Sequence, residues 1–446
     1  MTGPTATLPR TPTPPLARLL LPTADSVAAV RAGRSLTDVL SKLRPELRPA
    51  VLALSSDVLR QLGAALALRE QLAPKPPPAP VDALLLCALA LLWPRDGGPR
   101  YTDHTLVNQA VGAARMRFPA ATGFVNAVLR RFVRERDAWV AAIGQQPVAA
   151  YNHPLWWIER VRHDWPESWQ ALLHAGAQMP PLVLRVNARR SSVEAYLSRL
   201  SVQGLAAQAV GPQAIWLHDP VPVHELPGFV DGEVSVQDLS AQRAAPLLIS
   251  SGLHPGARVL DACAAPGGKT AHLLELADLQ VTALDADAGR LQRVRDTLGR
   301  LHLRAAELRC ADARAVPTWW DRRPFDAVLL DAPCTASGIV RRHPDIRWLR
   351  RPDDLTALAR LQAELLDALW PLVAPGGCLL YATCSIFRAE GQQQIDAFLQ
   401  RHAGDKPTVD PASPGHLLPL PDNSRSLVAG PALAGDGFFY ALLRKP

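Results

Sequence analysis

Between residues 25 and 145, apolar side chains recur three or four positions apart, with short polar breaks between the runs. That spacing puts them on one face of an α-helix. It predicts helices over residues 26–43, 51–72, 82–92, 101–111 and 122–143. No strand-like alternation interrupts these runs. We therefore expect an all-helical domain over residues 25–145, after a Pro-rich, disordered lead-in over residues 1–24.

The pattern changes at residue 146. A Trp-rich helical stretch leads to a short apolar strand at 182–187, a helix at 192–200 and a strand at 214–217. Prolines punctuate the segment and limit the length of each element. Residues 146–235 are therefore expected to form a small α+β module.

From residue 236 onwards, continuous apolar runs of strand length alternate with helical runs. Strands are predicted at 257–262, 280–284, 304–309, 325–330 and 377–383, with helices from 268, at 288–301 and at 353–370. Apolar strands separated by helices indicate a parallel sheet covered on both faces. The fold class is thus α/β, with a Rossmann-like domain over residues 236–446. Such sheets bind ligands beyond the carboxyl ends of their strands.

Charge is unevenly distributed along the chain. Residues 1–145 hold 18 Lys and Arg against 10 Asp and Glu, whereas the rest is close to neutral. A polyanion is a reasonable partner for the basic part. Its arginines cluster near the end of the helical domain, at Arg115, Arg117, Arg130, Arg131, Arg134 and Arg136.

The apolar run 84–93 is too short to span a bilayer and reads as a buried helix. The six cysteines form no CxxC pair or regular spacing, so neither a disulfide framework nor a zinc site is expected. We expect reduced thiols in a cytoplasmic protein without a metal.

A glycine turn follows the first strand of the α/β domain, in Asp261-Ala262-Cys263-Ala264-Ala265-Pro266-Gly267-Gly268-Lys269-Thr270. It ends like a phosphate-binding loop but has Cys263 where that loop has glycine. The Rossmann glycine fingerprint is absent. Acidic residues close the following strands at Asp285, Asp312 and Asp331. Together with Asp261, this series suits an adenosine with a cationic substituent, and S-adenosyl-L-methionine fits it better than a polyphosphate does.

Two thiols stand where two strands end, in Asp331-Ala332-Pro333-Cys334 and Thr383-Cys384-Ser385. A thiolate is the soft nucleophile that can add to an electron-poor ring carbon. The placement predicts covalent chemistry on a nucleobase, and by itself leaves open which thiol attacks. Cys87, Cys310 and Cys378 lie in apolar runs or strands and are expected to be packing residues.

The two cysteine motifs and the glycine turn resemble those of RNA cytosine-5 methyltransferases, the NOL/NOP/Sun family. The likeness extends upstream through Leu184-Arg185-Val186-Asn187 and downstream through Gly435-Asp436-Gly437-Phe438, and it covers roughly residues 25–446. It implies a NusB-like RNA-binding helical domain, S-adenosyl-L-methionine as cofactor and a cytosine of small-subunit ribosomal RNA as substrate. The cofactor contacts that it implies are Cys263, Ala264, Ala265, Pro266, Gly267, Gly268, Lys269, Asp285, Asp312 and Asp331.

The family pattern also implies a chemical role for each of three residues. It implies that Cys384 is the nucleophile, that Cys334 assists release of the product, and that Asp331 bonds the ring edge at N3 or N4. Arginines after the first cysteine loop should meet the RNA backbone, at Arg341, Arg342, Arg347, Arg350 and Arg351. His343 and Trp348 could stack on a base or pack in a core.

Ribosomal RNA is thus the expected partner of a monomeric enzyme with no membrane association. Two alternatives stay open. The same chemistry could act on transfer RNA, or the chain could be a catalytically inactive RNA-binding assembly factor. The intact Cys334, Cys384, Asp331 and Asp285 disfavour the second alternative.

Overall fold

The computed structural model describes residues 14–95, 98–420 and 435–446. Its contacts divide the chain into two compact units. One unit comprises Met1–Ile158 together with His343–Leu349, and the other comprises Glu159–Arg342 together with Arg350–Pro446. The helical unit therefore continues past the predicted boundary at residue 145 and takes in a stretch from much later in the chain.

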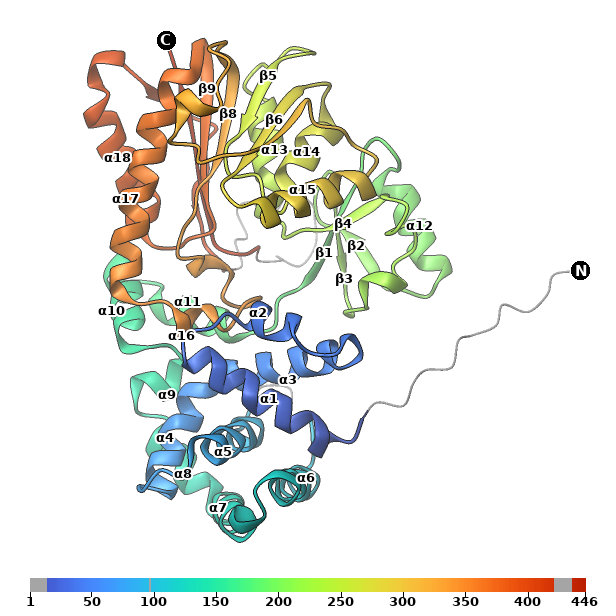
Figure 1. Cartoon of the computed structure of the whole chain (residues 1–446), viewed down its shortest axis with the longest axis vertical. Coiled ribbons are helices and arrows are strands. Elements are labelled where there is room, and N and C mark those ends of the chain that lie inside the picture. The colour runs from blue at the N-terminus through green and yellow to red at the C-terminus, as the bar shows by residue number, and fades with distance from the viewer. Residues whose placement is uncertain (1–13, 96–97, 421–434) are drawn as a thin grey trace, which may run out of the picture. The chain divides into compact units, whose positions relative to one another are not determined.

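The helical unit is built around α5, which is buried almost all round (Figure 1). This confirms that the apolar run at 84–93 is a core helix. The main helices are α1 (Leu16–Arg31), α2 (Leu36–Ser41), α3 (Arg48–Arg60), α4 (Leu62–Leu72), α5 (Ala79–Leu92), α6 (Asp103–Arg117), α7 (Thr122–Arg134), α8 (Arg136–Ile143) and α9 (Pro147–Tyr151). Polar side chains fix two of the starts, because Ser35 accepts from the Asp38 amide and Thr102 accepts from the Thr105 amide.

Helix α1 begins at Leu16, so the prediction of a disordered lead-in over residues 1–24 is wrong for residues 16–24. Pro22 lies inside this helix and removes one backbone donor. Leu20 and Val27 are fully buried in the core of the unit, and this burial offsets the cost of the proline. The rest of the predicted lead-in, residues 1–13, lies outside the described residues.

The stretch His343–Leu349 packs into the helical unit. The Trp348 indole donates to the Leu59 carbonyl at 2.8 Å, and the Asp345 carboxylate accepts from the Leu36 amide at 3.0 Å. Trp348 is thus a packing residue, whereas His343 is exposed. The short helix α16 (Ile346–Leu349) completes the core.

Within the parts of the chain that the structure describes, no single helix is long and apolar enough to cross a membrane. One pair of consecutive helical segments is long and apolar enough when taken together, Pro45–Arg60 with Leu62–Leu72. The two segments are bent by 69° where they join.

The second unit begins with a helical stretch and a small antiparallel sheet. Helix α10 (Leu155–Asp164) enters this unit at Glu159 and is followed by α11 (Trp169–Ala177). The sheet module then comprises β1 (Leu182–Val186), α12 (Val193–Val202), β2 (Ala207–Ala209), β3 (Ala214–Leu217) and β4 (Val234–Val236). The strand order is β2-β3-β1-β4. This confirms an α+β arrangement, with α12 packed on the sheet through Tyr196 and Leu200.

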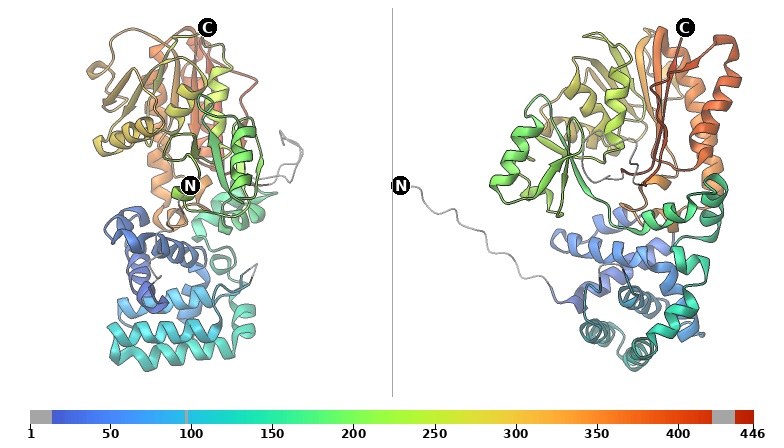
Figure 2. Two further views of the ribbon diagram at one scale, coloured as in Figure 1. Left: turned by 90° about the vertical axis from the view of Figure 1, so that its right-hand side faces the viewer. Right: turned by 180° about the vertical axis from the view of Figure 1, so that it is seen from behind.

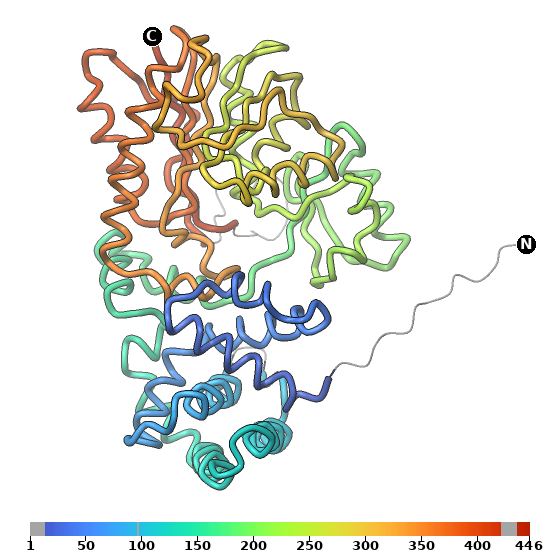
Figure 3. Tube along the Cα trace, viewed as in Figure 1, coloured from blue at the N-terminus to red at the C-terminus, as the bar shows by residue number. Residues whose placement is uncertain are grey.

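The large sheet of the second unit has the order β10-β12-β9-β8-β5-β6-β7. Its parallel strands are β5 (Arg258–Asp261), β6 (Gln280–Asp285), β7 (Glu307–Cys310), β8 (Phe325–Asp331) and β9 (Val373–Thr383). The C-terminal strand β12 (Phe438–Arg444) runs antiparallel to β9 and carries β10 (Thr408–Val409) and β11 (Gly415–Leu417). The chain trace shows this last strand lying beside the end of β9 (Figure 3). The sheet is therefore mixed rather than purely parallel.

Helices cover both faces of this sheet. The apolar cluster on one face includes α13 (Ala244–Ile249), α14 (Gly268–Leu276) and α15 (Ala288–Arg300). The cluster on the other face includes α17 (Pro352–Leu369) and α18 (Gln392–Arg401). The view from behind shows the two sets on opposite sides of the strands (Figure 2). The polar segments after β5, β6, β8 and β9 are thereby gathered at one edge of the sheet.

Candidate active site

The glycine turn joins β5 to α14 and is supported by neighbouring strands. The Ala262 amide donates to the Leu329 carbonyl at 2.9 Å, and the Ala264 amide donates to the Leu284 carbonyl at 2.8 Å. Gly267 has a φ of 98°, and a Cβ at this position would lie 3.1 Å from Val294 Cα, so a side chain there would be both strained and crowded. The turn is therefore fixed at the ends of β6 and β8, where a ligand of this fold binds.

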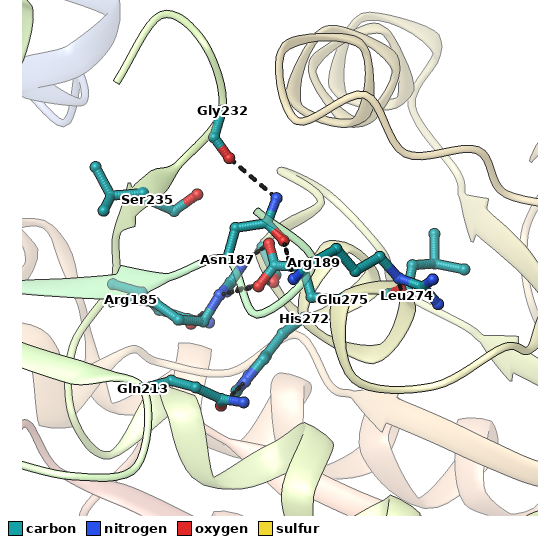
Figure 4. Close-up of polar contacts among 12 residues, drawn as sticks. Arg185, Asn187, Arg189, Gln213, Gly232, Ser235, His272, Leu274 and Glu275 are labelled. Carbon is teal, nitrogen blue, oxygen red and sulfur yellow. Dashed lines mark hydrogen bonds and ion pairs between the residues drawn. The ribbon is translucent and has the colours of Figure 1, made fainter. Parts of the chain in front are cut away.

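A buried ion pair supports the turn from the small module. Arg185 of β1 donates to both oxygens of Glu275 on α14, at 2.8 and 2.7 Å, and also to the Gly268 carbonyl at 2.9 Å. Figure 4 shows Arg185 and Glu275 facing each other, with Asn187 and Arg189 alongside. Both charged side chains are almost fully buried, so removing one partner would cost about 3–5 kcal/mol. The small module thus holds the helix that follows the turn, a role that its sequence did not indicate.

Three of the four predicted carboxylates lie together. Asp261 is fully buried, and its Oδ2 accepts from the Thr270 hydroxyl at 2.6 Å. Asp285 Oδ2 accepts from the Ala265 amide at 3.2 Å, and Asp331 Oδ2 accepts from Lys269 Nζ at 2.7 Å. Burial, with repulsion from the two neighbouring carboxylates, raises the pKa of Asp261 to about 7. This cluster is suited to a ligand with positive charge.

Two cations pair with the cluster: Lys269 with Asp331, and Arg290 with Asp285 Oδ2 at 3.5 Å. Burial alone would lower the pKa of Lys269, but the charge of Asp331 and the hydrogen bond between the two outweigh burial and raise this pKa above its ordinary value. Lys269 therefore stays charged and keeps one oxygen of Asp331 occupied. Asp312, the fourth predicted carboxylate, follows the edge strand β7, where it is half exposed and paired with Arg314 at 2.7 Å. Its cofactor contact stays a prediction.

The two predicted thiols meet. Cys334 Sγ and Cys384 Sγ are 3.4 Å apart, within hydrogen-bonding distance for sulfur. The contact follows from the sheet, because β8 and β9 are parallel neighbours whose ends pair Asp331 with Ala382. The hydrogen bond that the Cys334 thiol donates to Cys384, together with burial, raises the pKa of Cys334 well above its ordinary value. Cys334 is accordingly a neutral thiol that can donate to the sulfur of Cys384.

The remaining cysteines lie away from this contact. Cys87 and Cys378 are buried, as expected for packing residues. Cys263 is half buried in the glycine turn, where burial strongly raises its pKa. Cys310 is exposed, so the prediction that it packs inside is wrong. The reason is that β7 is the last strand of the sheet.

The predicted RNA contacts of the arginines after Cys334 are largely wrong. Arg341 and Arg342 share the carboxylate of Asp436, and Arg342 also donates to Asp238 at 2.7 Å. Arg347 is fully buried within the helical unit and donates to the Asn152 carbonyl. These guanidinium groups satisfy buried partners inside the protein.

The other two arginines differ from each other. Arg350 donates to the carbonyls of Thr335 and Cys334, at 3.1 and 3.3 Å, and so braces the first cysteine loop. Arg351 is exposed. Its backbone amide donates to the Asp354 carboxylate at the start of α17. An RNA contact of Arg351 stays a prediction.

Comparisons with known proteins follow the same division of the chain. The family model described as 16S rRNA methyltransferase RsmB/F matches residues 250–444, and the ferredoxin-like domain of RsmF/B-like methyltransferases matches residues 153–224. The chain is 46% identical over 374 residues to ribosomal RNA small subunit methyltransferase B of Pseudomonas putida, covering 82% of this chain and 83% of that protein. The chain belongs to the RsmB/F methyltransferase family.

Two further matches cover nearly the whole chain. Ribosomal RNA small subunit methyltransferase B of Pseudomonas syringae pv. tomato is 42% identical over 95% of this chain and 96% of that protein. The solved structure of PH0851 has a TM-score of 0.74 at 25% identity, covering 98% of this chain and 100% of that one. This RsmB/F family member is thus an RNA methyltransferase that uses S-adenosyl-L-methionine.

The residues at the glycine turn fit that cofactor. S-adenosyl-L-methionine carries a sulfonium and an ammonium group, and Asp261, Asp285 and Asp331 offer carboxylates at adjacent strand ends. Asp261 Oδ1 is buried without a hydrogen-bond partner in the described structure, as expected for an atom that a ligand would engage. When bound, the cofactor supplies an electrophilic methyl group. By contrast, the described residues hold no group of three or more His, Cys, Asp or Glu side chains placed to bind a metal ion.

Cofactor binding should depend on pH through Asp261. Its raised pKa leaves it protonated below about pH 7, and it gains its negative charge as the pH rises. Because the ionised fraction grows about tenfold between pH 6 and pH 8, affinity for S-adenosyl-L-methionine should rise by up to about tenfold. Isothermal titration calorimetry at both pH values measures this change. The Asp261→Asn variant should show a much smaller rise, and equal wild-type affinities at the two pH values would contradict the role of Asp261.

Proposed function

We propose that this chain methylates carbon 5 of a cytosine in small-subunit ribosomal RNA, through a covalent bond between Cys384 and carbon 6 of the base. The contact between the sulfurs of Cys334 and Cys384, 3.4 Å apart at the ends of neighbouring strands, carries this proposal. The small-subunit substrate is supported by the printed names of the relatives and of the matching family model.

Carbon 5 of cytosine is a weak nucleophile while the ring is aromatic. Addition of the Cys384 sulfur to carbon 6 breaks the aromaticity and raises electron density at carbon 5, which can then take the methyl group. Covalent catalysis of this kind divides one difficult step into two. Cys384 is partly exposed whereas Cys334 is buried, so Cys384 is the better placed of the two thiols to meet a nucleobase.

Asp331 is the residue we assign to the ring edge of the base. Lys269 occupies its Oδ2, which leaves Oδ1 to accept a hydrogen bond from the cytosine amino group. The ion pair fixes the carboxylate in place before substrate arrives, and such preorganisation favours the charge that develops in the ring.

Release requires a base, here taken to be a solvent water molecule, to accept the proton from carbon 5. The electron pair of that C–H bond forms the double bond between carbons 5 and 6 as the bond between sulfur and carbon 6 breaks. The electron pair of the sulfur–carbon bond returns to Cys384, which leaves as a thiolate. Cys334 keeps its proton, because its pKa is raised, and it can donate a hydrogen bond to the departing sulfur. We therefore assign Cys334 to product release.

The helical unit is proposed to bind RNA through α6 and α7. Its exposed arginines there are Arg115, Arg117, Arg130, Arg131 and Arg134. Arg136 is half buried and bonded to Asp103, so we leave it out of this surface. Phe124 of α7 is 38% exposed, whereas the neighbouring Val125 is fully buried. A base could stack on this ring beside phosphate-binding arginines.

We further propose that the enzyme works as a cytoplasmic monomer. All six cysteines are free in the described structure, which suits a reducing compartment.

Bisulfite sequencing of RNA from a deletion strain tests the substrate. Deletion should remove one 5-methylcytosine from small-subunit ribosomal RNA, and a plasmid with the wild-type gene should restore it. The Cys384→Ala gene should not restore it, although it still supplies the folded protein. Loss of a transfer-RNA methylcytosine alone would shift the substrate to transfer RNA, and no loss anywhere would favour an assembly factor.

A further inference from the structure

A buried carboxylate that no assignment above uses lies directly behind the two thiols. Glu390 ends the short 3-10 helix Arg388–Glu390 after β9, and it is fully buried. Its Oε1 accepts from the Thr335 amide at 2.8 Å and from Gln362 Nε2 at 3.2 Å. Its Oε2 accepts from the hydroxyls of Thr335 and Ser385, at 2.5 and 2.6 Å. Four donors thus meet one carboxylate, which is close to its full capacity.

These donors come from both cysteine loops. Thr335 directly follows Cys334, and Ser385 directly follows Cys384. Gln362, on α17, also donates to the Pro333 carbonyl at 2.8 Å, so the network holds the residue on each side of Cys334. The Glu390 carbonyl accepts from Thr383, the residue before Cys384, at 3.1 Å. One residue therefore bonds segments that flank both reactive sulfurs.

Two serine hydroxyls, those of Ser385 and Ser337, extend this network, and the direction of their hydrogen bonds can be assigned. The hydroxyl proton of Ser385 goes to Glu390, so in the contact of 2.8 Å between Ser337 and Ser385 the donor is Ser337. Ser337 in turn accepts from the Ile386 amide at 2.9 Å, and the Gly338 amide donates to the Cys384 carbonyl at 2.9 Å. The orientation of these hydroxyls thus depends on an acceptor at Glu390.

A second contact limits how the first loop can move. Gly338 lies against Gly437, whose amide donates to the Gly338 carbonyl at 2.9 Å, and a Cβ on Gly338 would collide with the Gly437 backbone. The first loop therefore has little space to adjust if the bonds to Glu390 are lost.

We propose that Glu390 is a positioning residue that sets the separation of the Cys334 and Cys384 sulfurs by tying both loops to one carboxylate. The consequence for catalysis rests on the proposed function, because Cys334 assists the departing sulfur only at hydrogen-bonding distance. Glu390→Gln keeps the shape of the side chain but places an NH2 group where a carboxylate oxygen accepts two bonds. The loops should separate or turn, while the glycine turn that holds the cofactor is untouched.

A thiol-bridging reagent tests the geometry without RNA. Dibromobimane becomes fluorescent when it links two neighbouring thiols, and peptide mass spectrometry identifies the pair. The parent protein is the Cys310→Ser variant, which lacks the exposed thiol, and it should form the link between Cys334 and Cys384. Glu390→Gln should form it much more slowly, with unchanged affinity for S-adenosyl-L-methionine.

Two sets of controls separate positioning from a general loss of stability. Glu275→Gln also replaces a buried carboxylate of the same unit, but one bonded to Arg185, and it should leave the rate of bridging unchanged. Thr335→Val should slow bridging, whereas Thr335→Ser, which keeps the hydroxyl, should restore it. In methylation assays, Glu390→Gln should lower kcat by about a hundredfold with little change in KM for RNA.

The outcomes distinguish this proposal from the proposed function. Bridging at the parental rate in folded Glu390→Gln would overturn the positioning role, whatever the RNA assays show. Absence of the link in the parent would overturn it as well. Slow bridging in the variant, together with a parent that methylates no cytosine, would keep the positioning role and refute the proposed function.

Discussion

Replacing Cys384 with alanine should lower RNA methylation by at least about a thousandfold, because the variant has no sulfur to add to carbon 6 of the base. Affinity for S-adenosyl-L-methionine should be unchanged, since the carboxylates of the glycine turn do not bond to this side chain. Transfer of a labelled methyl group to ribosomal RNA measures the first quantity, and calorimetry measures the second. With RNA that contains 5-fluorocytosine, the wild type should form a covalent adduct and the variant none.

Cys310→Ser is the matched control for the loss of a thiol, because Cys310 is exposed at the edge strand. It should methylate at the wild-type rate and form the adduct. Appreciable turnover in Cys384→Ala, or an adduct that maps to Cys334 in the wild type, would reverse the assignment of the two cysteines.

Replacing Cys334 with alanine should trap the enzyme on its substrate. The nucleophile remains, so attack and methyl transfer proceed, but the departing sulfur loses the donor that lies 3.4 Å away. We expect turnover to fall by about a hundredfold or more. On a denaturing gel, a complex of protein and RNA should survive and should carry the transferred methyl group.

The double variant Cys334→Ala with Cys384→Ala provides the control for this trapping. It should form no complex, because the bond to the base comes from Cys384. Multiple turnovers at the wild-type rate in the single variant would show that Cys334 is dispensable for release.

The positions of the strands and of the two thiols were predictable because the signals are local. An apolar run of strand length followed by a polar residue marks the end of β8 and of β9, and parallel neighbours bring such ends together. The contact between Cys334 and Cys384 also requires that β8 and β9 be neighbours, and the structure supplies that pairing. The antiparallel strand β12 was missed, because its apolar run says nothing about which neighbour it pairs with or in which direction.

The arginines after Cys334 show where sequence reasoning failed. A run of positive charge favours a polyanion, but the acidic partners of Arg341 and Arg342 lie about a hundred residues away on either side, at Asp238 and Asp436. No spacing rule connects these positions. A charged side chain can be assigned to solvent or to an ion pair only when the fold is known.

Glu390 was missed for a related reason. A single glutamate after a strand is unremarkable, and its buried state depends on α17 and both cysteine loops. One weak signal did exist, because each reactive cysteine is followed by a hydroxyl residue, Thr335 and Ser385. Buried hydroxyls need acceptors, so the pair implied an unidentified acceptor behind the thiols.

The inclusion of His343–Leu349 in the helical unit has a practical consequence for engineering. No single cut of the polypeptide yields two complete units. A fragment that ends after Ile158 lacks α16 and the Trp348 indole, which donates to the Leu59 carbonyl. A chimera that exchanges the helical half between relatives must therefore also transplant this late stretch. During synthesis on the ribosome, the helical half can reach its final packing only after most of the catalytic half has emerged.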